Sequence, residues 1–196
     1  MKFLIYILSF LCSFFVFSQE ETSKQFQDNL NAQFANKSES PLTDEDLKTF
    51  KTLDFFEINK KFIVEAKFVK SENEKIFEMK TSTNRLPKYV KYGELFFTID
   101  DFEFKLNVYQ NIDLIKKSGY EDYLFLPFSD LTCTKQSYIG GRYIDLRIPK
   151  NDKIIIDFNK AYNPYCAYNY KYSCPIVPLE NDLKIEILAG VKKFHE

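Results

Sequence analysis

Two carboxylates could do chemistry if the chain brings them together. Residues 142–148 and 153–159 each alternate apolar and polar side chains, which is typical of two paired strands. The register that keeps their large aliphatic side chains on one face places Asp145 opposite Asp157. Carboxylates facing each other at about 5 Å repel unless a proton or a cation lies between them. The pattern predicts either a pair for acid–base chemistry or a polar ligand site.

A cation beside this pair would compensate the repulsion between the two carboxylates. What that cation does decides between a functional and a structural interpretation of the pair. Arg142, Arg147 or a bound metal ion could compensate the charge, and the same register places Tyr143 opposite Asn159. With Arg142 holding an anionic group, the arrangement would suit a hydrolase or a lyase. The alternative is an arginine–aspartate network that only ties the hairpin to a loop, and both interpretations stay open.

An aromatic loop follows these strands. Five tyrosines lie between positions 162 and 172, beginning with Tyr162. Such a loop can stack on sugars or contact peptides, or it can cover irregular backbone and hydrogen-bond to it. Cys166 and Cys174 flank most of it, and in an exported protein a disulfide between them is the leading interpretation. Closing so short a loop would stabilise the fold by roughly 2–3 kcal/mol.

Other signals exclude several function classes. The single histidine is penultimate, which does not suit a Ser-His-Asp or Cys-His site, and three thiols with one terminal histidine make no zinc set. Gly140-Gly141 lacks the spacing of a phosphate loop and predicts a tight bend instead. A net charge of -1 gives no reason to expect nucleic acid. We expect no cofactor and no metal, and a small ligand or a protein partner stays open.

The N-terminus has the features of an export signal. Lys2 precedes an apolar stretch at residues 3–17, and the small Ser18 suits cleavage after it. Those fifteen residues fall short of the roughly 20 that a membrane-spanning helix needs. We therefore expect residues 1–18 to be removed, leaving a periplasmic or secreted protein with no membrane span. An uncleaved anchor and lipid attachment at Cys12 are the alternatives.

Two short helices are predicted ahead of the strands. Phe26, Leu30 and Phe34 recur four positions apart within the segment 19–41, which predicts an amphipathic helix there. A second helix is predicted to begin at Thr43, a good N-cap type with an acidic residue three positions on.

Residues 42–196 are predicted to form a single β-rich domain. A hairpin turn at Asp100-Asp101 would pair Ile99 with Phe102 and two further apolar pairs behind them. The regular spacing of short strands predicts a mainly β fold, an antiparallel sandwich or an open barrel. Besides the hairpin, the predicted strands are 62–69, 75–80, 123–128, 142–148, 153–158 and 183–188.

Several blocks of the sequence resemble one family. They are Tyr138-Ile-Gly-Gly-Arg-Tyr-Ile-Asp145, Asp157-Phe-Asn159, Ala161-Tyr-Asn-Pro-Tyr-Cys-Ala-Tyr168 and Ser173-Cys-Pro-Ile-Val-Pro178. They are similar to the bacterial and archaeal family catalogued as domain of unknown function 1684, and the similarity runs from about Leu42 to Gly190. Cys133-Thr134, Tyr165 and Val191 depart from the family pattern, which puts in doubt any role for the turn at 133–134.

The resemblance implies which positions belong to the family pattern. It implies no activity, because no activity is established for the family. Cys166, Cys174 and Asn181 are among the family-pattern positions. The others, which we expect to bind a ligand, are Asp130, Arg142, Tyr143, Asp145, Asp157, Asn159, Tyr162 and Asn163. The expected function is a non-enzymatic envelope protein that binds a small molecule, glycan or peptide. The alternatives are the hydrolase or lyase described above and a structural or interaction subunit.

Overall fold

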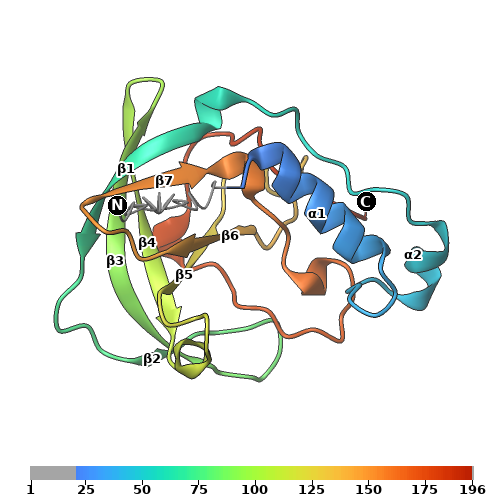
Figure 1. Cartoon of the computed structure of the whole chain (residues 1–196), viewed down its shortest axis with the longest axis horizontal. Coiled ribbons are helices and arrows are strands. Elements are labelled where there is room, and N and C mark those ends of the chain that lie inside the picture. The colour runs from blue at the N-terminus through green and yellow to red at the C-terminus, as the bar shows by residue number, and fades with distance from the viewer. Residues whose placement is uncertain (1–20, 196) are drawn as a thin grey trace, which may run out of the picture.

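The computed structural model describes residues 21–195, and the signal predicted at residues 1–18 lies outside them. Within the described part, the strands form one antiparallel sheet that curls into a half-barrel, and the two helices lie to one side of it (Figure 1). The predicted fold class is confirmed in its open-barrel form, with two short N-terminal helices.

The elements follow in chain order. The helices are α1 (Ser23–Ala35) and α2 (Asp44–Thr49). The strands are β1 (Ile63–Lys70), β2 (Phe77–Glu78), β3 (Lys88–Ile99), β4 (Phe102–Asn111), β5 (Tyr123–Phe128), β6 (Arg142–Arg147) and β7 (Lys153–Asp157). Across the sheet their order is β6-β5-β4-β3-β1-β7, and the short β2 pairs with β3.

Side-chain caps fix where the helices begin. The Thr22 side chain accepts a hydrogen bond from the backbone N–H of Gln25, whose side chain accepts one from Thr22 in return, which completes a capping box. Thr43 is the predicted N-cap of α2, and its side chain accepts from the backbone N–H of Asp46.

The central hairpin is the one the sequence predicts. Asp100 and Asp101 have φ values of 48° and 64°, as a two-residue turn that matches the strand twist requires. Ile99 pairs with Phe102 across β3 and β4, and the two apolar pairs behind them are also in register. A slip by one residue would reverse both faces, so the alternation specifies this register.

The predicted hairpin that would place Asp145 opposite Asp157 is wrong. β6 pairs with β5 and sets Asp145 opposite Phe125, whereas β7 pairs with β1 and sets Asp157 opposite Ile63. The alternation that suggested the hairpin is satisfied equally well by β5 and β1, because each of them also presents one apolar face. The connection at residues 149–152 carries the chain from one edge of the sheet to the other.

Two further predicted strands need correction. Residues 75–80 contribute only the two residues of β2, which pair with β3 rather than with the preceding strand. Residues 183–188 form no strand, although Leu183 and Ile187 are buried in the main core. Their burial explains the alternating pattern. Apolar and polar side chains can alternate along a segment that packs on a core even where the backbone pairs with no neighbouring strand.

Apolar residues form three clusters. The main core packs against one face of the sheet, with Leu124 and Ile144 among its members. An aromatic cluster that includes Phe125 and Tyr143 lies on the opposite face of β5 and β6. A third cluster lies beneath α1 around Phe34. The aromatic cluster lies on the face of the sheet from which Asp145 projects.

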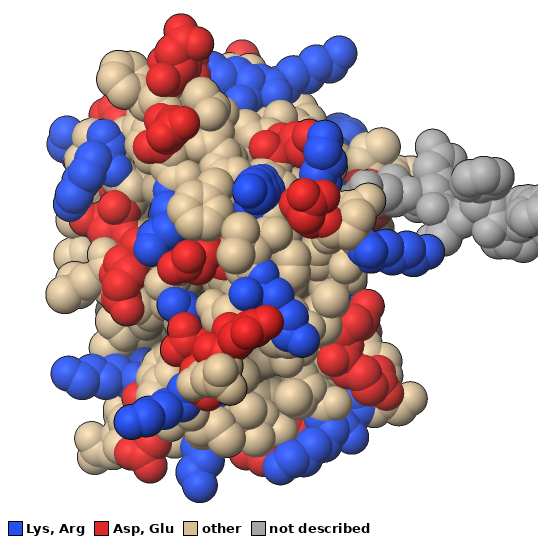
Figure 2. Space-filling view, turned by 90° about the vertical axis from the view of Figure 1, so that its left-hand side faces the viewer, with Lys and Arg blue, Asp and Glu red and all other residues tan. Residues whose placement is uncertain are grey.

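The surface carries both charge signs. Figure 2 shows Lys and Arg side chains interspersed with Asp and Glu over one face of the molecule. Charged side chains also pair across strands, as Lys153 does with Glu65 at 2.6 Å and Lys105 with Glu94 at 3.1 Å. Neither helix within residues 21–195 has the length and apolar content needed to cross a bilayer.

Candidate ligand pocket

Alternate side chains of β5 and β6 turn away from the main core and gather on one surface. Leu124 and Ile144 fill the core, whereas Phe125, Tyr143 and Asp145 project from the opposite face of the same strands. Asp145 lies directly opposite Phe125 in the ladder. The sheet therefore places one carboxylate on an aromatic floor.

A cavity of about 420 Å³ opens over this floor. Its size lies within the roughly 300–1,000 Å³ that is usual for small-molecule sites, and like them it is mostly apolar with few polar groups. The floor includes Tyr89 together with the β5 and β6 residues. The walls come from α1, from the turn after β4 and from the tyrosine loop, and they include Phe26, Leu30, Gln33, Leu114, Tyr162, Tyr165 and Tyr172.

Two phenols bind the same oxygen of Asp145. The Tyr123 hydroxyl donates to Oδ1 at 2.7 Å, and the Tyr162 hydroxyl donates to Oδ1 at 2.6 Å. Hydrogen bonds this short are typical of donors to an ionised acceptor. Within residues 21–195, Oδ2 has no hydrogen-bond partner and the carboxylate forms no ion pair. One oxygen is thus fixed in place and the other is left for a molecule in the pocket.

Burial governs the acid–base behaviour of this group. Solvent reaches Asp145 through the pocket mouth, yet desolvation by the surrounding protein raises the pKa of its carboxyl above the ordinary value, and the Tyr162 and Tyr123 hydrogen bonds only partly oppose this. Burial also raises the pKa of both phenols well above the usual value. Tyr123 and Tyr162 therefore stay protonated, and remain donors, across the physiological range.

Tyr143 contributes its ring to the pocket rather than its hydroxyl. The hydroxyl donates to the carbonyl oxygen of Pro175. Its backbone pairs with Tyr162 through two hydrogen bonds of 2.9 and 3.0 Å, and this pairing positions the Tyr162 hydroxyl over Asp145. The predicted pairing of Tyr143 with Asn159 is wrong for the same reason as the Asp145–Asp157 pair.

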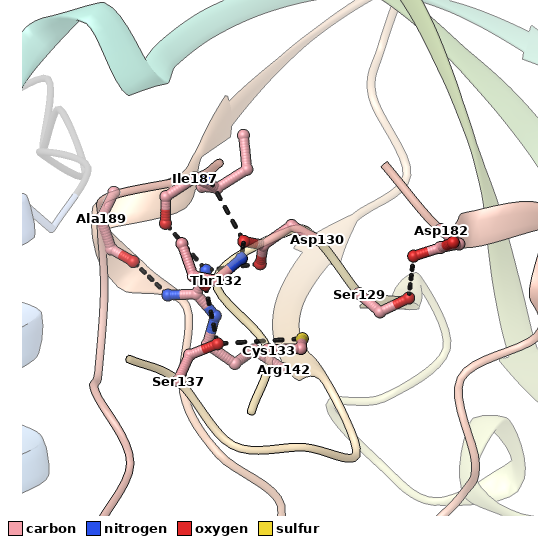
Figure 3. A network of polar contacts seen from close by, with 9 residues as sticks. All are labelled: Ser129, Asp130, Thr132, Cys133, Ser137, Arg142, Asp182, Ile187 and Ala189. Carbon is pink, nitrogen blue, oxygen red and sulfur yellow. Dashed lines mark hydrogen bonds and ion pairs between the residues drawn. The ribbon is translucent and has the colours of Figure 1, made fainter. Parts of the chain in front are cut away.

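Arg142 is held in a closed network on the other side of the sheet. Its Nη2 atom lies 2.7 Å from Asp130 Oδ2, and neither side chain is exposed to solvent. The guanidinium also donates to the carbonyl oxygens of Ile187 and Ala189, while Asp130 Oδ1 accepts from the backbone N–H of Thr132 and Ile187 (Figure 3). Arg142 and Asp130 therefore tie backbone segments together, and neither reaches the cavity.

Asp157 and Asn159 connect α1 and a loop to the sheet. Asp157 accepts from the Ser23 hydroxyl at 2.6 Å and from the backbone N–H of Asn159 at 3.0 Å. The Asn159 side chain exchanges two hydrogen bonds with the backbone of Asn59, at 2.9 and 3.1 Å. Asn163, also away from the cavity, donates to the carbonyl of Lys192. Of the eight residues predicted to bind a ligand, the structure brings three to the cavity: Tyr143, Asp145 and Tyr162.

The predicted disulfide is not formed. Cys166 and Cys174 are free thiols, as is Cys133. The backbone N–H of Cys166 lies 3.1 Å from Cys174 Sγ, so the two residues are close. Their thiol–thiol hydrogen bond lowers the pKa of Cys166 and raises the pKa of Cys174. Among residues 21–195, no three His, Cys, Asp or Glu side chains are placed to hold a metal ion.

Comparison with known proteins assigns the family. A profile described as "Protein of unknown function (DUF1684)" matches residues 48–192. The chain belongs to the DUF1684 family. A neighbour in structure is an uncharacterized protein of Haloarcula marismortui, determined by solution NMR, with 31% sequence identity and a TM-score of 0.68 over 86% of this chain and 91% of that one. No curated protein matches the sequence.

The pocket combines the DUF1684 region with a segment before it. Asp145 and its two phenols lie within the matched residues 48–192, whereas α1 precedes them. Phe26, Leu30 and Gln33 nevertheless form a wall of the cavity.

Sequence reasoning missed several pocket residues of this DUF1684 protein. Tyr123 was predicted only as a strand residue, and Gln33 had no signal beyond its place in a helix. Alternation within β5 would have put Tyr123 and Phe125 on the face opposite Leu124. Recognising the pocket, however, requires knowing that β5 pairs with β6, and the two strands are fourteen residues apart in the chain.

Proposed function

We propose that this DUF1684 protein binds one small, largely apolar molecule in the cavity, with a polar group of that molecule on Asp145 Oδ2. The observation that supports this most directly is the uneven use of the carboxylate: two phenols donate to Oδ1, and no described residue donates to Oδ2. Because solvent reaches Asp145, Oδ2 is free to accept from a molecule that enters the cavity. A ligand that donates to Oδ2 would gain a charge-assisted hydrogen bond there.

A non-enzymatic role fits the surroundings of Asp145 better than acid–base catalysis. The hydrolase or lyase alternative relied on a second carboxylate facing Asp145. Asp157 lies on the opposite edge strand and is engaged with Ser23 and Asn159. The cavity lining includes no other carboxylate and no histidine to act as the second group.

Filling the cavity tests this proposal. Leu114 lies in the lining but belongs to none of the three apolar clusters, so Leu114→Trp should block the cavity while the fold is kept. Indole and 2-phenylethanol serve as probes, and binding is followed by amide chemical shifts. We expect saturable shifts confined to β5, β6 and α1, and affinity at least tenfold weaker in Leu114→Trp.

The matched control adds the same side chain on the surface. Leu179 is 92% exposed and lies outside the cavity, so Leu179→Trp should bind both probes as the wild type does. Equal binding by the two variants, or shifts that map elsewhere on the molecule, would contradict the proposal.

We also propose that the protein is exported and loses residues 1–18. The supporting feature is the basic start followed by an apolar stretch that is too short to span a bilayer. Cleavage after Ser18 would leave Thr22, the N-cap of α1, intact. The intact mass of protein recovered from the native envelope or culture medium should correspond to a chain beginning at Gln19. A cytoplasmic protein that retains residues 1–18 would refute it.

A further inference from the structure

From the charge and the aromatic walls of the cavity, we infer that its ligand is an organic ammonium ion, an amine or quaternary ammonium group on an apolar body. The inference rests on the proposed function and names the chemical class of the molecule bound there. Three independent properties of the described residues support it. These are the negative charge of the cavity lining, the partners that already bind Arg147, and the arrangement of the aromatic rings around Asp145.

The cavity has one charged side chain, and it is negative. Of the described residues that line the cavity, Asp145 alone carries a full charge, and none is Lys, Arg or His. An anionic ligand would meet repulsion with nothing to offset it. A neutral ligand would exclude water from a carboxylate that solvent otherwise reaches and would leave it without a counter-ion, which is unfavourable. A cation is the one class that compensates the charge.

The basic side chain on the same strand as Asp145 is engaged elsewhere. Arg147 lies two residues along β6 from Asp145, and its electrostatic effect on Asp145 is the weakest of those that act on the carboxyl. Its Nη1 atom donates to Asp122 Oδ1 and to the carbonyl oxygen of Gly119, each at 2.6 Å. The guanidinium also lies 6.0 Å from the ring centroid of Tyr120. Arg147 thus has its own partners and forms no ion pair with Asp145, so an external cation can take that place.

The rings around Asp145 are arranged to accept a cation. Tyr143 meets Tyr162 edge to face at 5.9 Å and Phe125 at 4.7 Å, and Tyr162 in turn lies 6.4 Å from Phe26 on α1. An edge-to-face contact covers one face of the ring that receives the edge and leaves the opposite face uncovered by that contact, and an uncovered aromatic face attracts cations. Among the residues that the structure describes, no lysine or arginine is stacked on any of these four rings.

An inorganic cation fits this arrangement less well. Calcium takes about six to eight oxygen ligands and magnesium about six. Asp145 supplies one free oxygen, and the Tyr143 hydroxyl is already bound to Pro175. An ammonium group needs fewer polar partners and gains from aromatic faces, and a cavity of about 420 Å³ leaves room for an apolar body.

Three probes of similar size and different charge test the inference. These are 2-phenylethylamine, 2-phenylethanol and phenylacetate, measured by isothermal titration calorimetry with amide shifts to locate binding. We expect the amine to bind at least fivefold more tightly than the alcohol, and phenylacetate to bind more weakly than either. Asp145→Asn keeps an oxygen that can accept from both phenols but removes the charge, and it should abolish the preference for the amine.

Asp101→Asn is the matched control. It removes one negative charge at the exposed hairpin turn, where positive φ suits asparagine, and it should leave the preference unchanged. A preference below fivefold in the wild type, or one that persists in Asp145→Asn, overturns the inference. If the alcohol binds in the cavity as tightly as the amine, the proposed function stands and the ammonium inference falls. If no probe shifts the cavity residues, both fall.

A measurement on the wild type covers the case in which Asp145→Asn does not fold. The amine stays protonated throughout the acidic range, so acidification should weaken its binding as Asp145 takes up a proton, and the alcohol should bind almost equally throughout. The groups that face Asp145 are the phenols of Tyr123, Tyr162 and Tyr165, with Arg147 on its own strand. Burial raises the pKa of all three phenols, so they stay protonated on acidification, and equal pH profiles for amine and alcohol would also overturn the inference.

Discussion

At the residue scale, two aspartates near each other in the chain have opposite surroundings. Asp130 has its charge balanced by Arg142 and both oxygens bound, so nothing remains for a ligand. Asp145 has the same side chain, yet one oxygen has two donors, and among the described residues the other has none and no ion pair forms. The difference in partners, rather than in residue type, separates a structural carboxylate from a candidate anchor.

The raised pKa of Asp145 predicts that this residue costs stability at neutral pH. Desolvation raises the pKa in the folded state above that of the unfolded chain. Its contribution is therefore most favourable below the unfolded pKa of about 3.9 and is lost as the pH rises through the folded pKa. Asp145→Asn should have a higher melting temperature than the wild type at pH 7.5, and the difference should shrink at pH 4.

Thermal unfolding at the two pH values, without ligand, checks this. Asp101→Asn again serves as the control, because its exposed position should give no pH-dependent difference. A variant less stable than the wild type at pH 7.5 would mean that the two phenol hydrogen bonds outweigh desolvation. Stability gained at the expense of a binding group is a common signature of functional sites.

At the element scale, the Arg142–Asp130 pair holds an irregular segment in place. Residues 187–189 make no ladder, and their backbone groups bind the two side chains instead. Gly141 allows the chain to turn into β6 just before Arg142: its φ is +81°, and a Cβ there would lie 2.5 Å from the carbonyl oxygen of Phe128. The bend predicted at this glycine is confirmed, and it delivers Arg142 into the core.

This role predicts a large stability loss from a small change. Asp130→Asn would leave the fully buried guanidinium without its counter-ion, and removing one partner of a buried pair typically costs about 3–5 kcal/mol. Asp122→Asn is the matched control: it breaks an arginine–aspartate pair whose side chains are 54% and 55% exposed, and pairs of this kind contribute about 0–1 kcal/mol. Urea unfolding measures both, and similar losses in the two variants would contradict the assignment.

The pairing of the strands shows which parts of the fold can be predicted from the sequence and which cannot. The hairpin of β3 and β4 follows from local alternation and from two aspartates at its turn, so its register was predictable. The pairing of β6 was not, because several strands offer an equivalent apolar face and residues 149–152 resemble a turn while crossing between edges. Tyr162 and Asp145 are both among the residues that the sequence predicts to bind a ligand, but their meeting depends on a bridge between Tyr143 and Tyr162 that has no local signal.

At the scale of the whole molecule, the half-barrel separates two kinds of polar chemistry. The main-core side of β6 carries Arg142, whose hydrogen bonds hold backbone segments of the fold together. The outer side carries Asp145, which faces the cavity. Because side chains alternate along a strand, neighbouring residues serve the two purposes without interfering. The sequence places both in one block, and the structure shows that they belong to different faces.

The origin of the cavity walls has an evolutionary consequence. The carboxylate and its phenols come from the region that the family profile matches, while α1 contributes a wall from a stretch of chain before it. Substitution of Phe26 or Leu30 would reshape the cavity and leave Asp145 and its two phenols untouched. Under the proposed function, homologues with a different leading helix would differ in the molecules that fit above the same barrel.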